Sequence, residues 1–265
     1  MPICYNLYVP SRDRTYRCEA VVLRRKDFGE ADRLLTLFTP ELGKVRVVAK
    51  GIRKPASRKA GHLESFTRVK LLLAKGRDLD LITQVETINA YRPLREDLLR
   101  GAYASYAVEL LDKFMPDEQE NREMYDLLCH ALDWLCASPD LALTARYYEL
   151  QLLGLAGYQP QLFECVIGGE KIVAEDQYFS FDGGGAVCAH CGAERATPGV
   201  TPVSVNALKH LRYFQSNAYA KAIALKMRPG VHAEIDRLMM RHITHILERQ
   251  LKSVEFLKLI QREVA

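Results

Sequence analysis

Three cysteines have a spacing that is typical of a structural zinc site. Cys188 and Cys191 form a Cys-x-x-Cys pair in VCAHCG, and Cys165 opens a similar run, CVIGG, further upstream. Such a site holds zinc with four tetrahedral nitrogen or sulfur ligands, usually from two knuckles of this kind. Gly168 stands where the second cysteine of the first knuckle would be, and His190 is poorly placed to share a metal with the adjacent Cys191. The spacing suggests zinc but leaves the ligand set incomplete, and packing of the three thiols in a compact insert is the alternative.

Two other groups of potential ligands are less complete. Asp78 and Asp80 in RDLDL share one face of a predicted strand, which suits a divalent cation, but a catalytic site needs further carboxylates. Turn formation at the start of the strand is the alternative role of this pair. His242 and His245 in HITH lie within one helical turn, and such a pair without a third ligand is typical of core or surface histidines. The chain also lacks G-x-x-x-x-G-K-[ST] and G-x-S-x-G motifs, so we expect no enzymatic activity.

The densest cluster of one charge is basic. The stretch AKGIRKPASRKAG, residues 49–61, holds five positive charges and no negative one, and its proline and glycines disfavour a helix or strand. From Lys44 to Arg77, eleven Lys and Arg residues stand against one acidic residue, Glu64, which gives +10 in a chain of net charge +4. Such self-repulsion usually persists because a polyanion neutralises it, and nucleic acid is the first candidate. A solvated positive surface is the alternative.

Basic side chains on strands and on a glycine-flanked loop can follow nucleic-acid phosphates, with an affinity that falls as salt rises. The predicted DNA-contacting residues come from the first and third predicted strands and the basic loop: Arg24, Arg25, Lys44, Arg46, Lys50, Arg53, Lys54, Arg58 and Lys59. We expect this loop to be mobile and to close over a DNA backbone. Phe28, Phe38 and Phe66 lie in the same region, where an exposed ring would stack on bases, but we expect at least two of them to fill the core.

Five short strands must position these residues. They are rich in Val, Ile, Leu, Thr and Phe, are bounded by Gly, Pro and Asp, and read CEAVVLRRKD, DRLLTLFTP, KVRVVAKGI, LESFTRVKLLLAK and LDLITQVETI. Five strands in about 70 residues, with a long basic connection between the third and fourth, predict a small closed barrel of the oligonucleotide-binding (OB) type.

The periodicity becomes helical after the last predicted strand. Apolar residues recur at helical spacing in residues 103–114 and 124–135, and Ser138-Pro139-Asp140 starts a third helix that ends near Gly157. An irregular insert with the cysteines follows at residues 163–201. Helices then resume at Ser204, a predicted N-cap, and again after Pro229-Gly230. The fold class is therefore α+β with two domains, a barrel at residues 16–90 and a helical domain with a knuckle insert at residues 91–265.

Composition is consistent with this division. A chain of 265 residues is near the length at which one core splits into two, and 48% hydrophobic with 26% charged residues is the balance of a globular protein. The odd number of seven cysteines does not suit a disulfide framework. No apolar run approaches the roughly 20 residues of a membrane span, and none suits a signal peptide. We expect a cytoplasmic protein with no membrane partner.

Three stretches together resemble the RecO family of bacterial recombination mediators. VVLRRKDFGEADRLLTLFTPELGKVRVVAKGIRKPASR is similar to the family's opening barrel, LLGLAGYQPQLFECVIGG to the helix before its knuckle, and LERQLKSVEFL to its C-terminal stretch. The resemblance covers roughly residues 16–260 and leaves residues 1–15 as an N-terminal extension. Some family members bind zinc through four cysteines, and Gly168 is the departure from that pattern.

The resemblance implies a non-enzymatic protein that binds single- and double-stranded DNA and anneals complementary strands. It also implies contact with the acidic C-terminal tail of the single-stranded-DNA-binding protein, and work with RecR that helps RecA load. Candidate residues for the acidic tail in the helical domain are Lys113, Arg122, Arg146 and Tyr147. Two other functions stay open, a metal-dependent nuclease that uses Asp78 and Asp80, and an RNA-binding module built on the same barrel.

Overall fold

The computed structural model describes residues 14–194 and 200–264, which form two compact units. The first unit comprises the described residues up to Thr39 together with Val45–Ala90. The second comprises Pro40–Lys44 together with the described residues from Tyr91 onward. Most of the predicted extension at residues 1–15 lies outside the described residues. The short segment Pro40–Lys44, which the strand pattern assigns to the barrel, belongs by its contacts to the helical unit.

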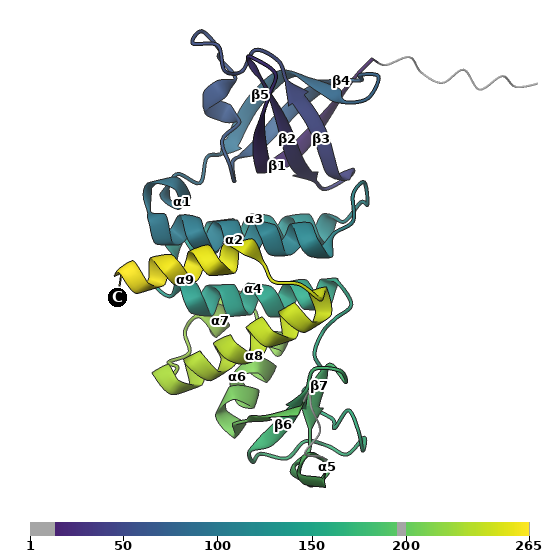
Figure 1. The fold of residues 1–265 in the computed structure, drawn as a ribbon, viewed down its shortest axis with the longest axis vertical. Coiled ribbons are helices and arrows are strands. Elements are labelled where there is room, and N and C mark those ends of the chain that lie inside the picture. Colours follow the sequence, from purple (N-terminus) through teal and green to yellow (C-terminus); the bar gives the residue numbers. More distant parts are fainter. Residues whose placement is uncertain (1–13, 195–199, 265) are drawn as a thin grey trace, which may run out of the picture. The chain divides into compact units, whose positions relative to one another are not determined.

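The first unit is a closed five-stranded barrel, as the strand pattern predicts (Figure 1). Its strands are β1 (Thr15–Phe28), β2 (Asp32–Thr39), β3 (Gly43–Ala49), β4 (Arg68–Ala74) and β5 (Asp80–Asn89). They close in the order β1-β2-β3-β5-β4, with β3 and β5 parallel and the pairs β1–β2, β1–β4 and β4–β5 antiparallel. A five-stranded barrel of this kind with a long β3–β4 connection is an OB fold.

Strand β1 is long because it serves two neighbours. Its first half, Thr15–Val21, pairs with β4, and its second half, from Val21 to Phe28, pairs with β2. The register with β2 shifts between Val22 and Arg24. A bulge of this kind bends and twists a strand, which is what barrel closure needs at this point.

Alternating side chains fill the barrel. In β4, Val69, Leu71 and Leu73 are buried while Arg68 and Lys70 point away from the core. Strand β3 contributes Val47 and Ala49 to the same core, strands β1, β2 and β5 contribute Ala20, Val22, Leu35, Leu37 and Ile82, and the β3–β4 connection adds Ile52 and Leu63. The period of two thus places the basic residues of β3 and β4 off the core side of the sheet.

The second unit is mainly helical (Figure 1). Its helices outside the insert are α1 (Pro93–Glu96), α2 (Leu98–Phe114), α3 (Arg122–Ala137), α4 (Leu141–Leu155), α6 (Val205–Ser216), α7 (Tyr219–Ala222), α8 (Pro229–Leu247) and α9 (Lys252–Val264). Side chains at Asp97, Asn121, Asp140 and Ser204 accept the hydrogen bonds that cap α2, α3, α4 and α6. The prediction of Ser204 as an N-cap is confirmed.

Helix α4 lies at the centre of this unit. It packs against α2, α3, α6 and α8, and every residue from Leu143 to Leu150 is buried. A helix that is buried on all sides needs apolar residues all round or paired polar ones. Helix α9 packs on α2 and brings the C-terminal part of the described chain back onto the first long helix.

The insert between α4 and α6 contains a small sheet that the sequence pattern did not predict. Strands β6 (Gln177–Ser180), β7 (Gly185–Val187) and β8 (Val200–Val203) form an antiparallel sheet in the order β7-β6-β8, and the short helix α5 (Ala189–Glu194) follows β7. Each strand has three or four residues, which is too short for a period of two to stand out. No helix among the residues described is long and apolar enough to span a membrane.

Candidate functional site

The basic connection between β3 and β4, residues 50–59, is anchored to the barrel. Ile52 is buried in the barrel core. The amide of Gly51 donates to Asp32 Oδ1 at 2.7 Å, and the amide of Arg53 donates to a carbonyl of the β1–β2 hairpin at 2.9 Å. This differs from the expected mobile loop, because one apolar side chain and two backbone hydrogen bonds fix its first half.

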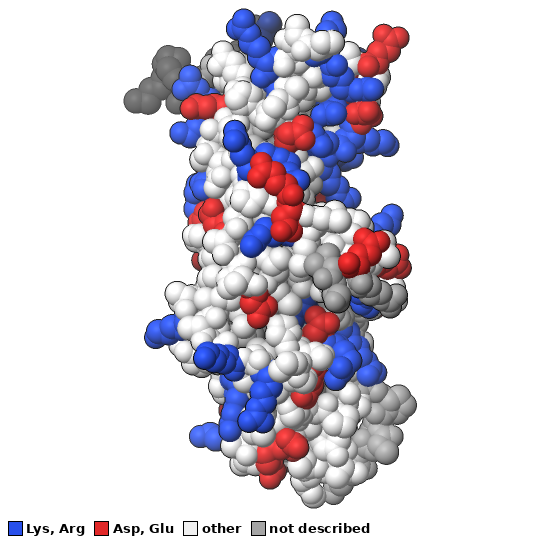
Figure 2. All heavy atoms as spheres, turned by 90° about the vertical axis from the view of Figure 1, so that its left-hand side faces the viewer, with Lys and Arg blue, Asp and Glu red and all other residues white. Residues whose placement is uncertain are grey.

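Six of the nine predicted DNA-contacting cations are exposed, and four of these six form no ion pair within the described chain. We call them the exposed quartet: Arg46, Lys50, Lys54 and Arg58. Arg24 is also exposed, on β1, but it takes part in another interaction. Figure 2 shows Lys and Arg side chains gathered over the barrel unit, with Asp and Glu side chains among them.

Three further predicted cations are held by groups of the barrel itself. Arg25 Nη1 lies 2.5 Å from Glu64 Oε2, and Arg53 Nη1 lies 3.5 Å from Asp27 Oδ2. Lys59 donates from Nζ to a main-chain carbonyl of β5 at 3.0 Å. Ion pairs at partly exposed positions are weak, so Arg25 and Arg53 can exchange their partners for a phosphate, but part of their charge is already balanced.

Lys44 is placed differently from the rest of the predicted set. Its side chain is buried and lies within the helical unit, where Nζ donates to the main-chain carbonyl of Asp112 at 2.9 Å. It also pairs with Asp112 Oδ1 at 3.2 Å and Asp117 Oδ1 at 3.1 Å. With two carboxylates beside it and little exposed surface, Lys44 fastens its own segment to the end of α2.

One aromatic side chain of the barrel is open to solvent. Phe28, at the end of β1, is 48% exposed, whereas Phe38 and Phe66 are buried. The sequence predicts that at least two of these rings fill the barrel; Phe38 and Phe66 are buried, but neither belongs to the cluster of side chains that forms the barrel core. Phe28 is thus the member of this group that can stack on an unpaired base.

The four residues predicted to meet an acidic tail fall into two pairs. Arg146 and Tyr147 of α4 are buried, and Tyr147 donates from its hydroxyl to the carbonyl of Asn217 at 3.1 Å. Arg122 is well exposed and lies 2.6 Å from Glu41, and Lys113 is half-buried near the end of α2. Only the second pair is accessible to a partner.

Arg146 instead belongs to a buried polar network. It pairs with Glu149 at 2.6 Å and with Asp236 of α8 at 3.3 Å, and the hydroxyl of Tyr106 in α2 donates to Glu149. Burial raises the pKa of Glu149 to about 7, although the positive charge of Arg146 and the Tyr106 hydrogen bond act against the rise. The network joins three helices and explains why α4 tolerates charged residues in its core.

The two aspartates of the nuclease hypothesis do not form a metal-binding cluster with other acids in the part of the chain that the structure describes. Asp80 accepts from the hydroxyl of Tyr16 at 2.5 Å through Oδ2 and from the amide of Gly76 at 3.0 Å through Oδ1. Both of its oxygens are thus occupied. Oδ1 helps to form the turn before β5, in line with the alternative role of Asp78 and Asp80, and Oδ2 links β5 to β1.

The histidine pair on α8 is a core feature. His242 is buried against Phe179 and Phe181 of the insert, with ring centroids 5.2 and 6.4 Å away. His245 is more exposed and lies 3.2 Å from Asp182. Of the two roles expected for such a pair, His242 is a core histidine and His245 is nearer the surface, and the pair joins α8 to the insert.

The two halves of the knuckle have the same turn. The amide of Gly168 donates to Cys165 Sγ at 3.4 Å, and the amide of Cys191 donates to Cys188 Sγ at 3.4 Å. The next amide in each half, from Gly169 and from Gly192, donates to the carbonyl of the first cysteine at 2.8 and 2.9 Å. Gly168 therefore occupies the position that Cys191 occupies in the other half.

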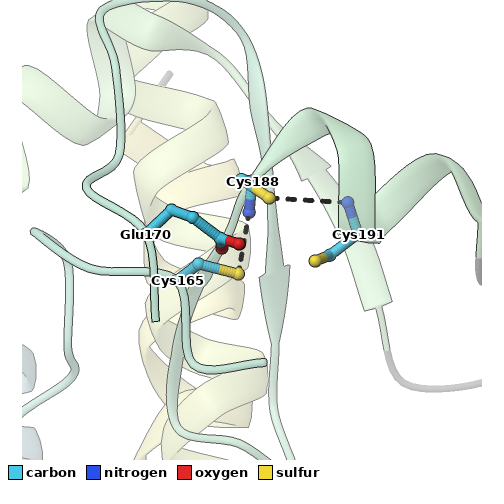
Figure 3. Close-up of side chains that lie close together, drawn as sticks. All are labelled: Cys165, Glu170, Cys188 and Cys191. Atoms are coloured by element: carbon cyan, nitrogen blue, oxygen red, sulfur yellow. Dashed lines mark hydrogen bonds between the residues drawn. The ribbon is translucent and has the colours of Figure 1, made fainter. Parts of the chain in front are cut away.

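A fourth potential ligand completes the cluster of thiols. Figure 3 shows the carboxylate of Glu170 beside the sulfurs of Cys165, Cys188 and Cys191, and all four ligand atoms lie within 4.8 Å of one another. The search of the sequence for cysteine and histidine missed Glu170. The sequence feature that points to this ligand is an acidic residue two positions after Gly168, the glycine at the place of the missing knuckle cysteine.

Backbone amides and neighbouring sulfurs shift the pKa values of two of the thiols in opposite directions. Burial alone would raise the pKa of Cys165, but amides of Gly168 and Cys188 donate to its sulfur and lower the pKa to about 7. The pKa of Cys191 is raised to about 12, chiefly by its hydrogen bond with Cys188 and then by burial. Ionised thiols so close together repel one another, and a bound cation removes that repulsion.

Comparison with known proteins adds an independent finding. The family profile "Recombination protein O N terminal" matches residues 14–91, and "Recombination protein O C terminal" matches residues 95–255. A protein of Roseiflexus sp. (strain RS-1), named DNA repair protein RecO, is 44% identical over 247 residues, 93% of this chain and 86% of the relative. Proteins of the same name from Dehalococcoides mccartyi and Pelotomaculum thermopropionicum are 34% and 36% identical over 252 and 244 residues. The match to the Dehalococcoides protein covers 95% of this chain and 98% of the relative. The match to the Pelotomaculum protein covers 92% of this chain and 94% of the relative.

An OB-type barrel with exposed cations, a helical unit with a knuckle insert and these matches define a protein of recombinational DNA repair. The chain belongs to the RecO family. The resemblance inferred from its three sequence stretches is thereby confirmed.

Proposed function

We propose that this protein is a non-catalytic mediator that binds single- and double-stranded DNA through its barrel and anneals complementary strands. The observation that carries the proposal is the exposed quartet, four cations without a recorded ion pair on an OB barrel. Fixed cations that are already neutralised by carboxylates, such as Lys44, contribute little to counterion release. The quartet supplies the charge that remains for phosphates.

Annealing follows from the same chemistry. Two complementary strands repel each other, and a cationic surface lowers this repulsion when it contacts both backbones. Phosphate contacts carry no sequence information, so the strands remain free to shift until their bases pair. Phe28 adds a site at which one unpaired base can stack without being selected by sequence.

The helical unit is our proposed site for protein partners. A tail that is acidic attracts exposed cations, and Arg122 and Lys113 are the two members of the predicted set that are accessible. We propose that these residues help to bind the acidic C-terminal tail of the single-stranded-DNA-binding protein. We also propose that the protein acts together with RecR and that this joint action promotes the loading of RecA onto DNA.

The test removes the exposed quartet and measures DNA binding as a function of salt. We expect the variant with Arg46, Lys50, Lys54 and Arg58 replaced by alanine to bind a single-stranded oligonucleotide at least about 10-fold more weakly at 0.1 M salt. Each lost phosphate contact lowers the slope of log K against log salt by about 0.7, so four lost contacts flatten it by about 3. Fluorescence anisotropy with a labelled oligonucleotide measures both quantities.

A matched control removes the same charge from the other unit. Replacement of Lys209, Lys221, Lys226 and Lys258 by alanine deletes four exposed lysines of the helical unit and changes the net charge equally. This control variant should have the same slope of log K against log salt as the parent. Equal loss in both variants would show that only net charge matters, and tighter binding of structured RNA than of DNA would favour an RNA-binding module instead.

A further inference from the structure

The knuckle of this protein has the backbone of two metal-binding turns but only three cysteines. In both turns an amide three residues after the first cysteine donates to its sulfur, at 3.4 Å in each case. The next amide donates to the carbonyl of the same cysteine in both turns. Gly168 therefore stands at a ligand position with no side chain to offer.

The space beside Gly168 is already filled. A Cβ atom built on this glycine would lie 2.1 Å from Glu170 Oε2 and 2.8 Å from the Glu170 carboxyl carbon. The chain turns back sharply after Gly169, whose φ is +80°, and the amide of Cys165 donates to the carbonyl of Glu170 at 2.7 Å. The glutamate carboxylate thus reaches into the volume that a cysteine side chain at position 168 would occupy (Figure 3).

The donor set fits zinc. Zinc binds thiolate sulfur at about 2.3 Å and carboxylate oxygen at about 2.0–2.2 Å, so tetrahedral ligands lie roughly 3.5–3.8 Å apart. The four ligand atoms here are within 4.8 Å of one another before any ion draws them together. His190 is exposed and is not a member of this group.

We propose that Glu170 replaces the missing knuckle cysteine and gives one carboxylate oxygen to a zinc ion held by Cys165, Cys188 and Cys191. Three thiolates and one carboxylate carry the same formal charge as the four thiolates of a complete knuckle. With all four positions filled by protein, the ion has a structural role, and it ties the turn at Cys165–Glu170 to the turn that leads from β7 into α5.

The test compares metal binding by the full-length protein and by Glu170→Gln. Zinc content after purification is measured by mass spectrometry, and the apo protein is titrated with Co²⁺, whose absorption reports the number of thiolate ligands and the coordination geometry. We expect one zinc per parent chain and a spectrum of tetrahedral cobalt with three thiolates. We expect Glu170→Gln to lower zinc affinity at least about 10-fold, since loss of an outer-shell partner alone costs 10–100-fold.

Glu175→Gln is the matched control, because Glu175 is an exposed glutamate of the same insert that is not in the cluster. It should keep the parent's affinity and spectrum. If Glu170→Gln fails to fold, Glu170→Cys answers the question, because a thiol at this position should keep zinc and add the charge-transfer band of a fourth thiolate.

Three results would overturn the proposal. The first is that the parent chain binds no zinc. The second is that Glu170→Gln binds zinc as tightly as the parent with an unchanged cobalt spectrum, and the third is that Glu170→Cys retains the three-thiolate spectrum. Each of these outcomes excludes Glu170 as a ligand; the first leaves Cys165, Cys188 and Cys191 as residues that pack the insert, and the other two leave them as zinc ligands without the glutamate.

Discussion

His242 is buried, and neither of its ring nitrogens has a hydrogen-bond partner among the residues described. Burial, and then the nearby charge of His245, lowers its pKa from 6.5 to about 4. The unfolded state therefore binds more protons than the folded state between about pH 4 and 6.5. It follows that the stability associated with His242 is fully present above pH 6.5 and is lost as the pH falls toward 4.

We predict that His242→Leu reduces this acid sensitivity. Relative to the parent, the variant should gain up to about 1.4 kcal/mol of stability for each pH unit below 6.5, because leucine has no charge to desolvate. Thermal unfolding followed by circular dichroism from pH 7 to pH 5 measures the difference. Glu149, with its raised pKa, contributes a slope of opposite sign in an overlapping range, so only the comparison of variant with parent isolates His242.

His130→Leu is the control for this prediction, since it removes an exposed histidine from α3. Its free energy of unfolding is measured over the same pH range, so that the loss of a buried histidine is compared with the loss of an exposed one. A constant difference between His242→Leu and the parent across the same range would contradict the assignment of a depressed pKa.

The sequence shows which residues of the site are basic or sulfur-bearing, because those properties and their local spacing do not depend on the fold. It does not show which charges are available. Lys44 is neutralised by Asp112, which lies 68 positions further along the chain. Arg146 is buried because α4 is surrounded by other helices. Glu170 becomes a ligand candidate only through the turn after Gly169, which local spacing of cysteines and histidines does not reveal.

At the scale of elements, the long strands and helices are predictable because their apolar residues repeat over many positions. Strand β4 and helix α3 are clear examples, with alternate and helical spacing of their buried residues. The sheet β7-β6-β8 is not predictable in this way, because its strands have only three or four residues each. The anchoring of the β3–β4 connection also escapes prediction, because Asp32 and Gly51 belong to different elements.

We predict that this anchoring slows hydrogen exchange in the connection. The amides of Gly51 and Arg53 should be protected, and Asp32→Ala should speed exchange at Gly51 by about 10- to 150-fold, because a hydrogen bond to a charged acceptor contributes about 1.5–3 kcal/mol. Exchange detected by mass spectrometry or NMR on residues 50–59 measures the effect.

Asp27→Ala serves as the control, because Asp27 pairs with the side chain of Arg53. It should leave the exchange of Gly51 unchanged. Full exchange of the parent's loop within seconds would restore the alternative of a mobile loop that closes over DNA.

At the scale of the whole molecule, charge is segregated along the chain. Residues 44–77 carry +10, and because the net charge is +4, the remainder carries −6. Strong positive charge in one region favours contact with DNA, and a net negative remainder limits nonspecific wrapping of DNA around the rest of the protein. This division of charge supports the proposed annealing role, in which strands are brought together without one sequence being held.

The most direct test of this account is the annealing of two complementary labelled oligonucleotides coated with the single-stranded-DNA-binding protein, at several salt concentrations and without divalent metal. We predict that the parent speeds annealing, that the effect fades as salt rises, and that the variant without the exposed quartet loses most of it while the helical-unit control keeps it. No acceleration by a parent protein that still binds the DNA would contradict the role in annealing.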